Sequence, residues 1–125
     1  MRKQNALLII DAQYDFCHPN GTLYVPGADK DMVRLQQFIL NNHQNLDHIC
    51  VTLDSHPVND ISHPSFWMDK NGQFPAPFTQ ITLSDIEAGI WAPRFSPIEA
   101  TKYVADLEAQ GEFPHFIWPE HCLIG

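Results

Sequence analysis

The sequence is short of basic residues and of cysteine, and it has no long apolar run. Lys and Arg together number 7 against 15 Asp and Glu, which leaves a formal net charge of −8. This acidic balance argues against binding to a nucleic-acid backbone or to an anionic membrane surface. The 3 cysteines are odd in number and lack the C-x-x-C spacing, which argues against a disulfide framework. The apolar run after the basic start, Ala6–Ile10, is too short for a signal peptide or a membrane span, so we expect a cytoplasmic protein.

Three short apolar runs predict the strands of a parallel sheet. Ala6–Asp11 and His48–Leu53 are apolar without alternation, and each run meets an acid at its end. Such runs are typical of strands buried on both faces of an α/β sheet. A third, shorter strand is predicted over His115–Trp118. With 125 residues, no internal repeat and no low-complexity tract, we expect a single α/β domain over residues 1–125.

Two helices are predicted between these strands. Asp29 is the expected cap of a helix over about 30–42, whose apolar residues fall on one stripe. A second helix is expected to reach about residue 110, and its start and end carry the signals of a capping box, a first-turn proline and a terminal glycine: Ser96, Glu99, Pro97 and Gly111. The alternation of strands and helices implies right-handed βαβ units.

The connection between the second strand and the second helix, residues 55–95, is unusually long. It is rich in proline and contains five aromatic residues: Phe66, Trp67, Phe74, Phe78 and Trp91. Loops of this length in a compact domain are usually functional. The aromatic residues could equally form a small core beneath the loop, and the sequence leaves both interpretations open.

Acids and histidines gather just past the predicted strand ends. Asp11 follows the first strand, where it could be a functional group or merely cap the next turn. Asp54, His56 and His63 follow the second strand, and His121 follows the third. Each histidine alone could be an ordinary core or surface residue, but parallel strands share one rim, so the four groups can converge. Imidazole and carboxylate together suit zinc or iron. The remaining histidines have no such setting, and we expect them to be structural: His18, His43, His48 and His115.

Four motifs in order resemble the isochorismatase-like cysteine hydrolases, most closely their nicotinamidase branch. The matching stretches cover essentially the whole chain: Asp11–Phe16, Gly21–Gly27, Thr52–Pro57 with His63–Phe66, and Trp118–Cys122. The resemblance implies a three-layer, Rossmann-like parallel-sheet sandwich, here incomplete at its C-terminal side. It also implies hydrolysis of an amide, such as nicotinamide to nicotinate and ammonia, through a cysteine thioester.

The resemblance assigns roles to individual residues. Asp11 would be the catalytic base, and the metal ligands would be Asp54, His56, His63 and His121. The metal would be zinc, with iron or manganese as alternatives. Substrate contacts would come from Phe16 and Trp118. A small-molecule amide is the implied partner, and the full-length protein is expected to be a homo-oligomer.

The chain also departs from the family pattern. Tyr14, Leu53 and Ser55 replace residues usual in the first and third motifs, which bears on substrate identity. The family's catalytic lysine and nucleophilic cysteine would follow the Trp118–Cys122 segment, so we expect no nucleophile within this chain. None of the candidates present stands at the matching position: Cys17, Cys50, Cys122, Lys70 and Lys102. Two further hypotheses stay open, namely a non-catalytic metal-binding or scaffold module and a hydrolase for another substrate such as isochorismate.

Overall fold

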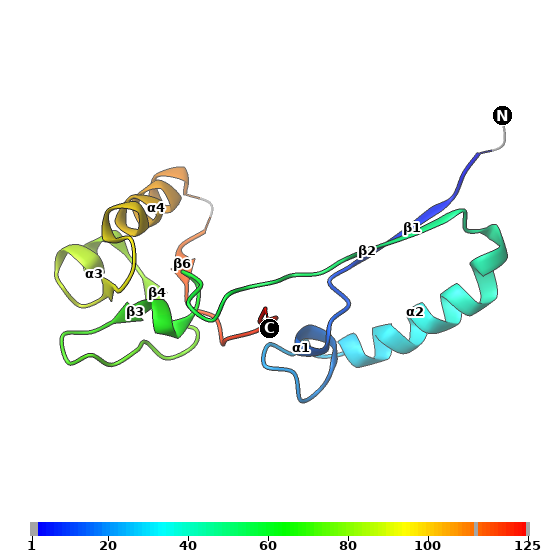
Figure 1. The fold of residues 1–125 in the computed structure, drawn as a ribbon, viewed down its shortest axis with the longest axis horizontal. Coiled ribbons are helices and arrows are strands. Elements are labelled where there is room, and N and C mark those ends of the chain that lie inside the picture. Colours follow the sequence, from blue (N-terminus) through cyan, green and yellow to red (C-terminus); the bar gives the residue numbers. More distant parts are fainter. Residues whose placement is uncertain (1–2, 112, 125) are drawn as a thin grey trace. The chain divides into compact units, whose positions relative to one another are not determined.

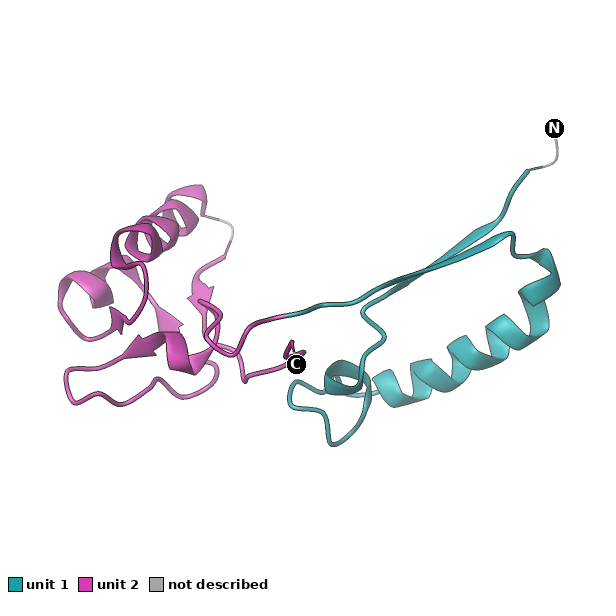
Figure 2. Ribbon diagram, in the orientation of Figure 1, with its two compact units in different colours: residues 1–55 teal, residues 56–125 magenta. Residues whose placement is uncertain are grey.

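The computed structural model describes residues 3–111 and 113–124. The chain divides into two compact units, residues 1–55 and residues 56–125 (Figure 2). Both strands and helices occur in the chain (Figure 1). Among the described residues, no helix combines the length and the apolar character that crossing a membrane requires.

The first unit is built on a parallel strand pair. Strand β1 (Ala6–Ile10) pairs with β2 (His48–Thr52), and the register runs from Ala6 opposite His48 to Ile10 opposite Thr52. Helix α2 (Ala28–Asn42) and the short 3-10 helix η1 (His43–Asn45) connect the two strands (Figure 1). The predicted βαβ unit, its two strands and its parallel pairing are therefore confirmed.

The chain between β1 and α2 contains a short helix and a tight turn. Residues Tyr14–Cys17 form a single helical turn, α1. The following turn requires glycine at position 21, because a Cβ atom there would lie 2.4 Å from the Asp15 carbonyl oxygen. The predicted cap of α2 is wrong: Gly27 occupies that position with a φ of 92°, and Asp29 lies in the first turn. Glycine adopts this left-handed conformation without steric cost, while the Asp29 carboxylate accepts a hydrogen bond of 2.7 Å from the Tyr24 hydroxyl.

The second unit has its own core, built largely from the long connection. Within it lie η2 (Pro64–Phe66), β3 (Trp67–Met68), β4 (Gln80–Ile81), α3 (Leu83–Glu87) and β5 (Ala92–Pro93). These are followed by α4 (Pro97–Gln110) and β6 (His115–Phe116). The core residues are Phe66, Trp67, Ile81, Ala100, Val104 and Ile117. Of the aromatic residues of the long connection, Phe66 and Trp67 belong to this core and Trp91 packs against it, as one of the two interpretations of the sequence had it. Phe74 and Phe78 are exposed.

The strand predicted over His115–Trp118 does not extend the parallel pair among the described residues. It is shortened to β6, and β6 pairs antiparallel with β4, Ile81 lying opposite His115. A second antiparallel pair joins β3 to β5. Strand β4, the partner of β6, lies in the long connection. The sequence therefore predicted a strand correctly at β6 but predicted the wrong neighbour for it.

The two α-helices of the second unit begin in different ways. Pro97 begins α4 and Gly111 ends it with a φ of 68°, as predicted. Ser96 precedes α4 in a left-handed conformation, φ 41°, and its side chain makes no capping hydrogen bond, so the predicted capping box is wrong. A capping box is present instead at α3, where the side chains of Thr82 and Asp85 each accept from the other's backbone N–H.

Candidate metal centre

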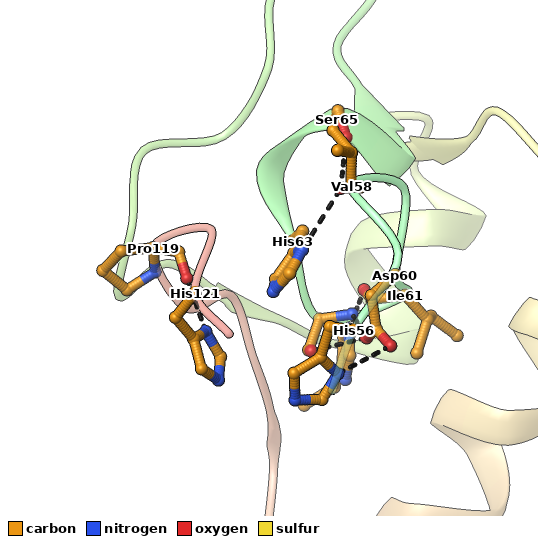
Figure 3. Close-up of polar contacts among 10 residues, drawn as sticks. His56, Val58, Asp60, Ile61, His63, Ser65, Pro119 and His121 are labelled. Atoms are coloured by element: carbon orange, nitrogen blue, oxygen red, sulfur yellow. Dashed lines mark hydrogen bonds and ion pairs between the residues drawn. The ribbon is translucent and has the colours of Figure 1, made fainter. Parts of the chain in front are cut away.

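Three of the predicted metal ligands meet within the second unit. The rings of His56 and His121 have centroids 4.8 Å apart. The ring of His63 lies 5.3 Å from that of His56 and 5.2 Å from that of His121. Figure 3 shows the three rings grouped together, each with a hydrogen bond at one ring nitrogen. We call His56, His63 and His121 the histidine cluster.

A backbone bridge brings the two distant members of the cluster together. The His56 N–H donates to the Cys122 carbonyl oxygen at 2.9 Å, and the Ile124 N–H donates to the His56 carbonyl oxygen at 2.9 Å. These bonds form a parallel bridge between His56 and Leu123. Cys122 has a φ of 48°, a conformation that is strained for a residue with a side chain and that often marks a functional site. His121 therefore reaches His56 through this bridge, not through adjacent parallel strands as the sequence had suggested.

A tight turn places the third histidine. The Asp60 N–H donates to the Pro57 carbonyl oxygen, and the His63 N–H donates to the Asp60 carbonyl oxygen at 2.9 Å. Pro64 then begins η2. The His63 side chain is completely buried.

Hydrogen bonds to carbonyl groups fix the tautomers of two histidines. Nδ1 of His63 lies 3.1 Å from the Val58 carbonyl oxygen, and Nδ1 of His121 lies 2.7 Å from that of Pro119. A carbonyl oxygen can only accept, so each Nδ1 carries the proton and each Nε2 carries the lone pair. Nε2 of His63 is buried and has no hydrogen-bond partner among the described residues. A buried orphan nitrogen is costly unless something binds it, and a lone pair on Nε2 is what a metal ion requires.

The third histidine meets a carboxylate instead of a carbonyl group. Nδ1 of His56 lies 3.0 Å from Oδ2 of Asp60. Burial raises the pKa of Asp60, but the hydrogen bonds from the Ser62 hydroxyl, the Ser62 N–H and His56 outweigh it and lower that pKa to about 2. Asp60 is therefore ionised at neutral pH and accepts the Nδ1 proton of His56.

The donor set of the cluster fits a divalent metal ion. All three imidazoles have an oxygen acceptor at Nδ1, which is the arrangement that surrounds metal-ligating histidines in proteins. One ligand atom each from His56 and His121 lies within 4.8 Å of the other. Three imidazoles with one further ligand match the preferences of zinc.

Asp54, the fourth predicted ligand, lies near the end of the first unit. It stands two residues before His56, and this chain length keeps the two Cα atoms within about 7 Å. Its backbone is clamped by one side chain: the Asp54 N–H donates to Oε1 of Gln13 at 2.7 Å, and Nε2 of Gln13 donates to the Asp54 carbonyl oxygen at 2.9 Å. Gln13 thus extends the pairing of β1 with β2 up to the acid that follows β2.

Asp11, the predicted base, lies directly past the end of β1. Its N–H donates to the backbone and side-chain oxygens of Thr52, and the Thr52 hydroxyl donates to Oδ1 of Asp11 at 2.7 Å. Asp11 has a φ of 52°, which costs about 1 kcal/mol for a residue with a Cβ atom. The strain and the reciprocal bonds together hold the carboxylate at the strand end.

Comparison with known proteins places the fold. A solved structure of the yeast nicotinamidase Pnc1p matches with a TM-score of 0.58 and 23% sequence identity. The match covers 96% of this chain and 44% of that one. The same enzyme bound to the inhibitor nicotinaldehyde matches equally well, at 22% identity. The chain has the fold of a nicotinamidase.

This likeness confirms the predicted α/β class and the isochorismatase-type fold. The chain spans 44% of the length of the nicotinamidase chains that it matches. No family model and no curated protein sequence matches the chain.

The two predicted substrate-contacting residues belong to different units. Phe16 lies in α1 of the first unit. Trp118 lies in the second unit, half-exposed, with its ring 5.9 Å from that of Phe78 and 6.1 Å from that of Phe116. Their roles stay predictions. Cys50 lies in β2 as expected, but its side chain is exposed in the described structure and not packed.

Sequence reasoning missed three residues that position the predicted ones: Gln13, Thr52 and Asp60. Gln13 and Thr52 stood inside the matched motifs but were given no role. Asp60 could have been found from the Asp-x-Ser pattern, because Oδ1 of Asp60 accepts from the Ser62 N–H at 2.9 Å in a turn typical of aspartate.

Proposed function

We propose that this chain forms the metal-binding part of a nicotinamidase-like amide hydrolase. The observation that supports it most directly is the histidine cluster, in which three imidazoles carry their lone pairs on Nε2 and one of these nitrogens is buried without a partner in the described part of the chain. The likeness in fold to a nicotinamidase supports the amide as substrate class.

The ligands in this proposal are His56, His63 and His121, with Asp54 completing the set. Zinc suits these donors best, and iron or manganese would also accept them. A bound divalent ion would supply a Lewis acid that orients and polarises the ligand. The chain's own contribution is to fix the three imidazole tautomers before the metal arrives, so that little reorganisation accompanies binding.

Asp11 is the proton acceptor in this proposal. Its carboxylate is held by the Thr52 hydroxyl at 2.7 Å, and an oriented, ionised carboxylate can take a proton from an attacking group. In the whole enzyme that group would be a cysteine thiol, whose thiolate attacks the amide carbon to form a thioester and release ammonia. Water then cleaves the thioester to give the carboxylic acid. We place the nucleophile outside the motifs that this chain contains.

Metal analysis tests the proposal. The purified chain should bind one zinc ion per molecule, and the double variant His56→Ala/His121→Ala should bind none. The double variant His43→Ala/His48→Ala is the matched control, because those residues lie in the first unit, outside the cluster. Equal zinc content in the parent and in the His56→Ala/His121→Ala protein would contradict the proposed site.

A non-catalytic metal-binding role is the second candidate. It is favoured by the fact that all three histidines belong to the second unit, whereas Asp11 belongs to the first. Release of ammonia from nicotinamide by the zinc-loaded protein distinguishes the two. Zinc binding without turnover, in a protein of the length of the matched nicotinamidase, would favour the binding module.

A further inference from the structure

Asp60 occupies a special position in the turn between His56 and His63. Its Oδ2 atom accepts from Nδ1 of His56 at 3.0 Å. Its Oδ1 atom accepts from the Ser62 N–H at 2.9 Å and from the Ser62 hydroxyl at 2.6 Å. Its carbonyl oxygen accepts from the His63 N–H at 2.9 Å. One residue thus holds the ring of one cluster histidine (Figure 3) and the backbone of another.

The contact between Asp60 and His56 differs from its two counterparts. His63 and His121 donate to neutral carbonyl groups, whereas His56 donates to a carboxylate. A charged acceptor strengthens the hydrogen bond and makes the opposite ring nitrogen a better electron donor. The side chains of His56 and Asp60 are only 22% and 23% exposed, so water screens this pair less than it would a surface pair.

The two carboxylate oxygens of Asp60 bind different partners. Ser62 directs both of its bonds to Oδ1, which orients the carboxylate and turns Oδ2 towards His56. An amide in place of the carboxylate would keep its oxygen towards Ser62, because both Ser62 groups donate there. It would then present an NH₂ group to Nδ1 of His56, which could no longer donate. The ring proton would move to Nε2 and block the nitrogen that a metal ion needs.

We propose that Asp60 is a positioning residue that holds His56 as the Nδ1-protonated tautomer and thereby sets the metal affinity of the histidine cluster. The inference rests on the proposed function for its metal and extends it to a residue outside the ligand set. Partners of this kind typically contribute 10–100-fold to metal affinity.

The first test measures zinc affinity by competition with a chromophoric chelator at pH 7.5. Asp60→Asn is expected to weaken zinc binding about 10–100-fold relative to the parent chain. Asp69→Asn is the matched control: Oδ1 of Asp69 accepts from the N–H groups of Asn71 and Gln73 in a similar turn, but no described contact joins it to an imidazole. It should bind zinc within about twofold of the parent. An Asp60→Asn protein that also stays within that range would overturn the proposal.

The second test needs no metal. In the metal-free chain with ¹⁵N-labelled histidine, the ring nitrogen shifts should show His56 protonated at Nδ1 in the parent and in Asp69→Asn, and at Nε2 in Asp60→Asn. An unchanged His56 tautomer in Asp60→Asn would overturn the proposal. A parent chain that binds no zinc would defeat the proposed function, and the tautomer measurement would still decide the role of Asp60.

A third variant guards against misfolding. The intrinsic tryptophan fluorescence, to which the buried Trp67 contributes, reports whether the second unit is intact. If Asp60→Asn loses that signal, Asp60→Glu takes its place, because it keeps a carboxylate for His56. A folded Asp60→Glu protein should keep Nδ1 protonated and bind zinc within about tenfold of the parent. Protonation at Nε2 in that protein would overturn the proposal.

Discussion

Asp11 is not among the proposed metal ligands, so its role can be tested separately from metal binding. The Asp11→Asn substitution keeps the size of the side chain and the hydrogen bond to Thr52, but it removes the proton acceptor. In an active form of the enzyme we expect amide hydrolysis to fall by about 10²–10⁴-fold, while zinc content is unchanged. Asp31→Asn, an exposed acid in α2, is the control. Activity of Asp11→Asn within about twofold of the parent would rule out Asp11 as the base.

His115 makes the stability of the second unit depend on pH. It is buried, its Nε2 donates to the Ile61 carbonyl oxygen at 3.0 Å, and its ring lies against Trp67 and Tyr103. Burial lowers its pKa below 6.5, and the Ile61 bond and the Asp60 charge oppose that shift only in part. The unfolded chain therefore takes up a proton more readily than the folded one below pH 6.5. The contribution of His115 to the free energy of unfolding should be constant above pH 6.5 and fall as the pH drops below that value.

Urea unfolding followed by intrinsic tryptophan fluorescence, at pH 7.5 and pH 5.5, checks this expectation. His115→Gln keeps a donor for Ile61 but does not titrate, so its urea midpoint should fall less on acidification than that of the parent. Because the two proteins differ only at position 115, the comparison isolates the contribution of His115. Equal losses in the two proteins would show that His115 does not contribute.

At the scale of single elements, the starts of α3 and α4 predict different losses of stability when the residue at the cap is replaced. The Thr82 hydroxyl accepts from the Asp85 N–H at 3.0 Å, so Thr82→Ala should destabilise the second unit by about 1 kcal/mol. Ser96 makes no such bond, and Ser96→Ala should change stability by less than about 0.5 kcal/mol. The same urea titration at pH 7.5 measures both. A larger loss for Ser96→Ala than for Thr82→Ala would restore the capping box expected from the sequence.

The elements that the sequence predicted well are those whose signal is local. The apolar runs at β1 and β2 and the glycine at the end of α4 each depend on a few neighbouring residues. Ser96 failed because a capping box requires an extended backbone at the cap, and the chain enters α4 there at φ 41°. No pattern of residues in the sequence predicts this backbone angle at Ser96.

The site was predictable in its members and not in its geometry. His56, His63 and His121 were found by their positions after strands, yet their meeting depends on the bridge between His56 and Leu123. Pairing between two residues that lie 67 positions apart leaves no periodic pattern in the sequence. Asp60 was overlooked for a related reason, since its importance arises only when Oδ2 meets a ring nitrogen.

On the scale of the whole molecule, the parallel strand pair should drive association. Both faces of the pair carry large exposed apolar side chains: Leu8, Ile10, Ile49 and Val51. Apolar strands of this kind are buried on both faces in stable α/β domains, and an uncovered pair promotes pairing between chains. We therefore expect residues 1–125 to associate as concentration rises, and Leu8→Lys to reduce that association.

Light scattering after size-exclusion chromatography, over a tenfold range of protein concentration, measures the effect. Lys3→Glu, at an exposed position before β1, is the control for a change of charge near the same strand. A parent chain that stays monomeric throughout would contradict the expectation.

The acceptors behind the histidine cluster differ in how mutation can reach them. Two of the three, at Val58 and Pro119, are main-chain oxygens, which every amino acid possesses. Only the acceptor at Asp60 is encoded by a side chain. A library of single substitutions screened for zinc retention should therefore tolerate most replacements at positions 58 and 119 and yield loss of binding at position 60. Single amino-acid substitutions therefore cannot remove two of the three acceptors, and the contribution of these two could be measured only by altering the backbone itself.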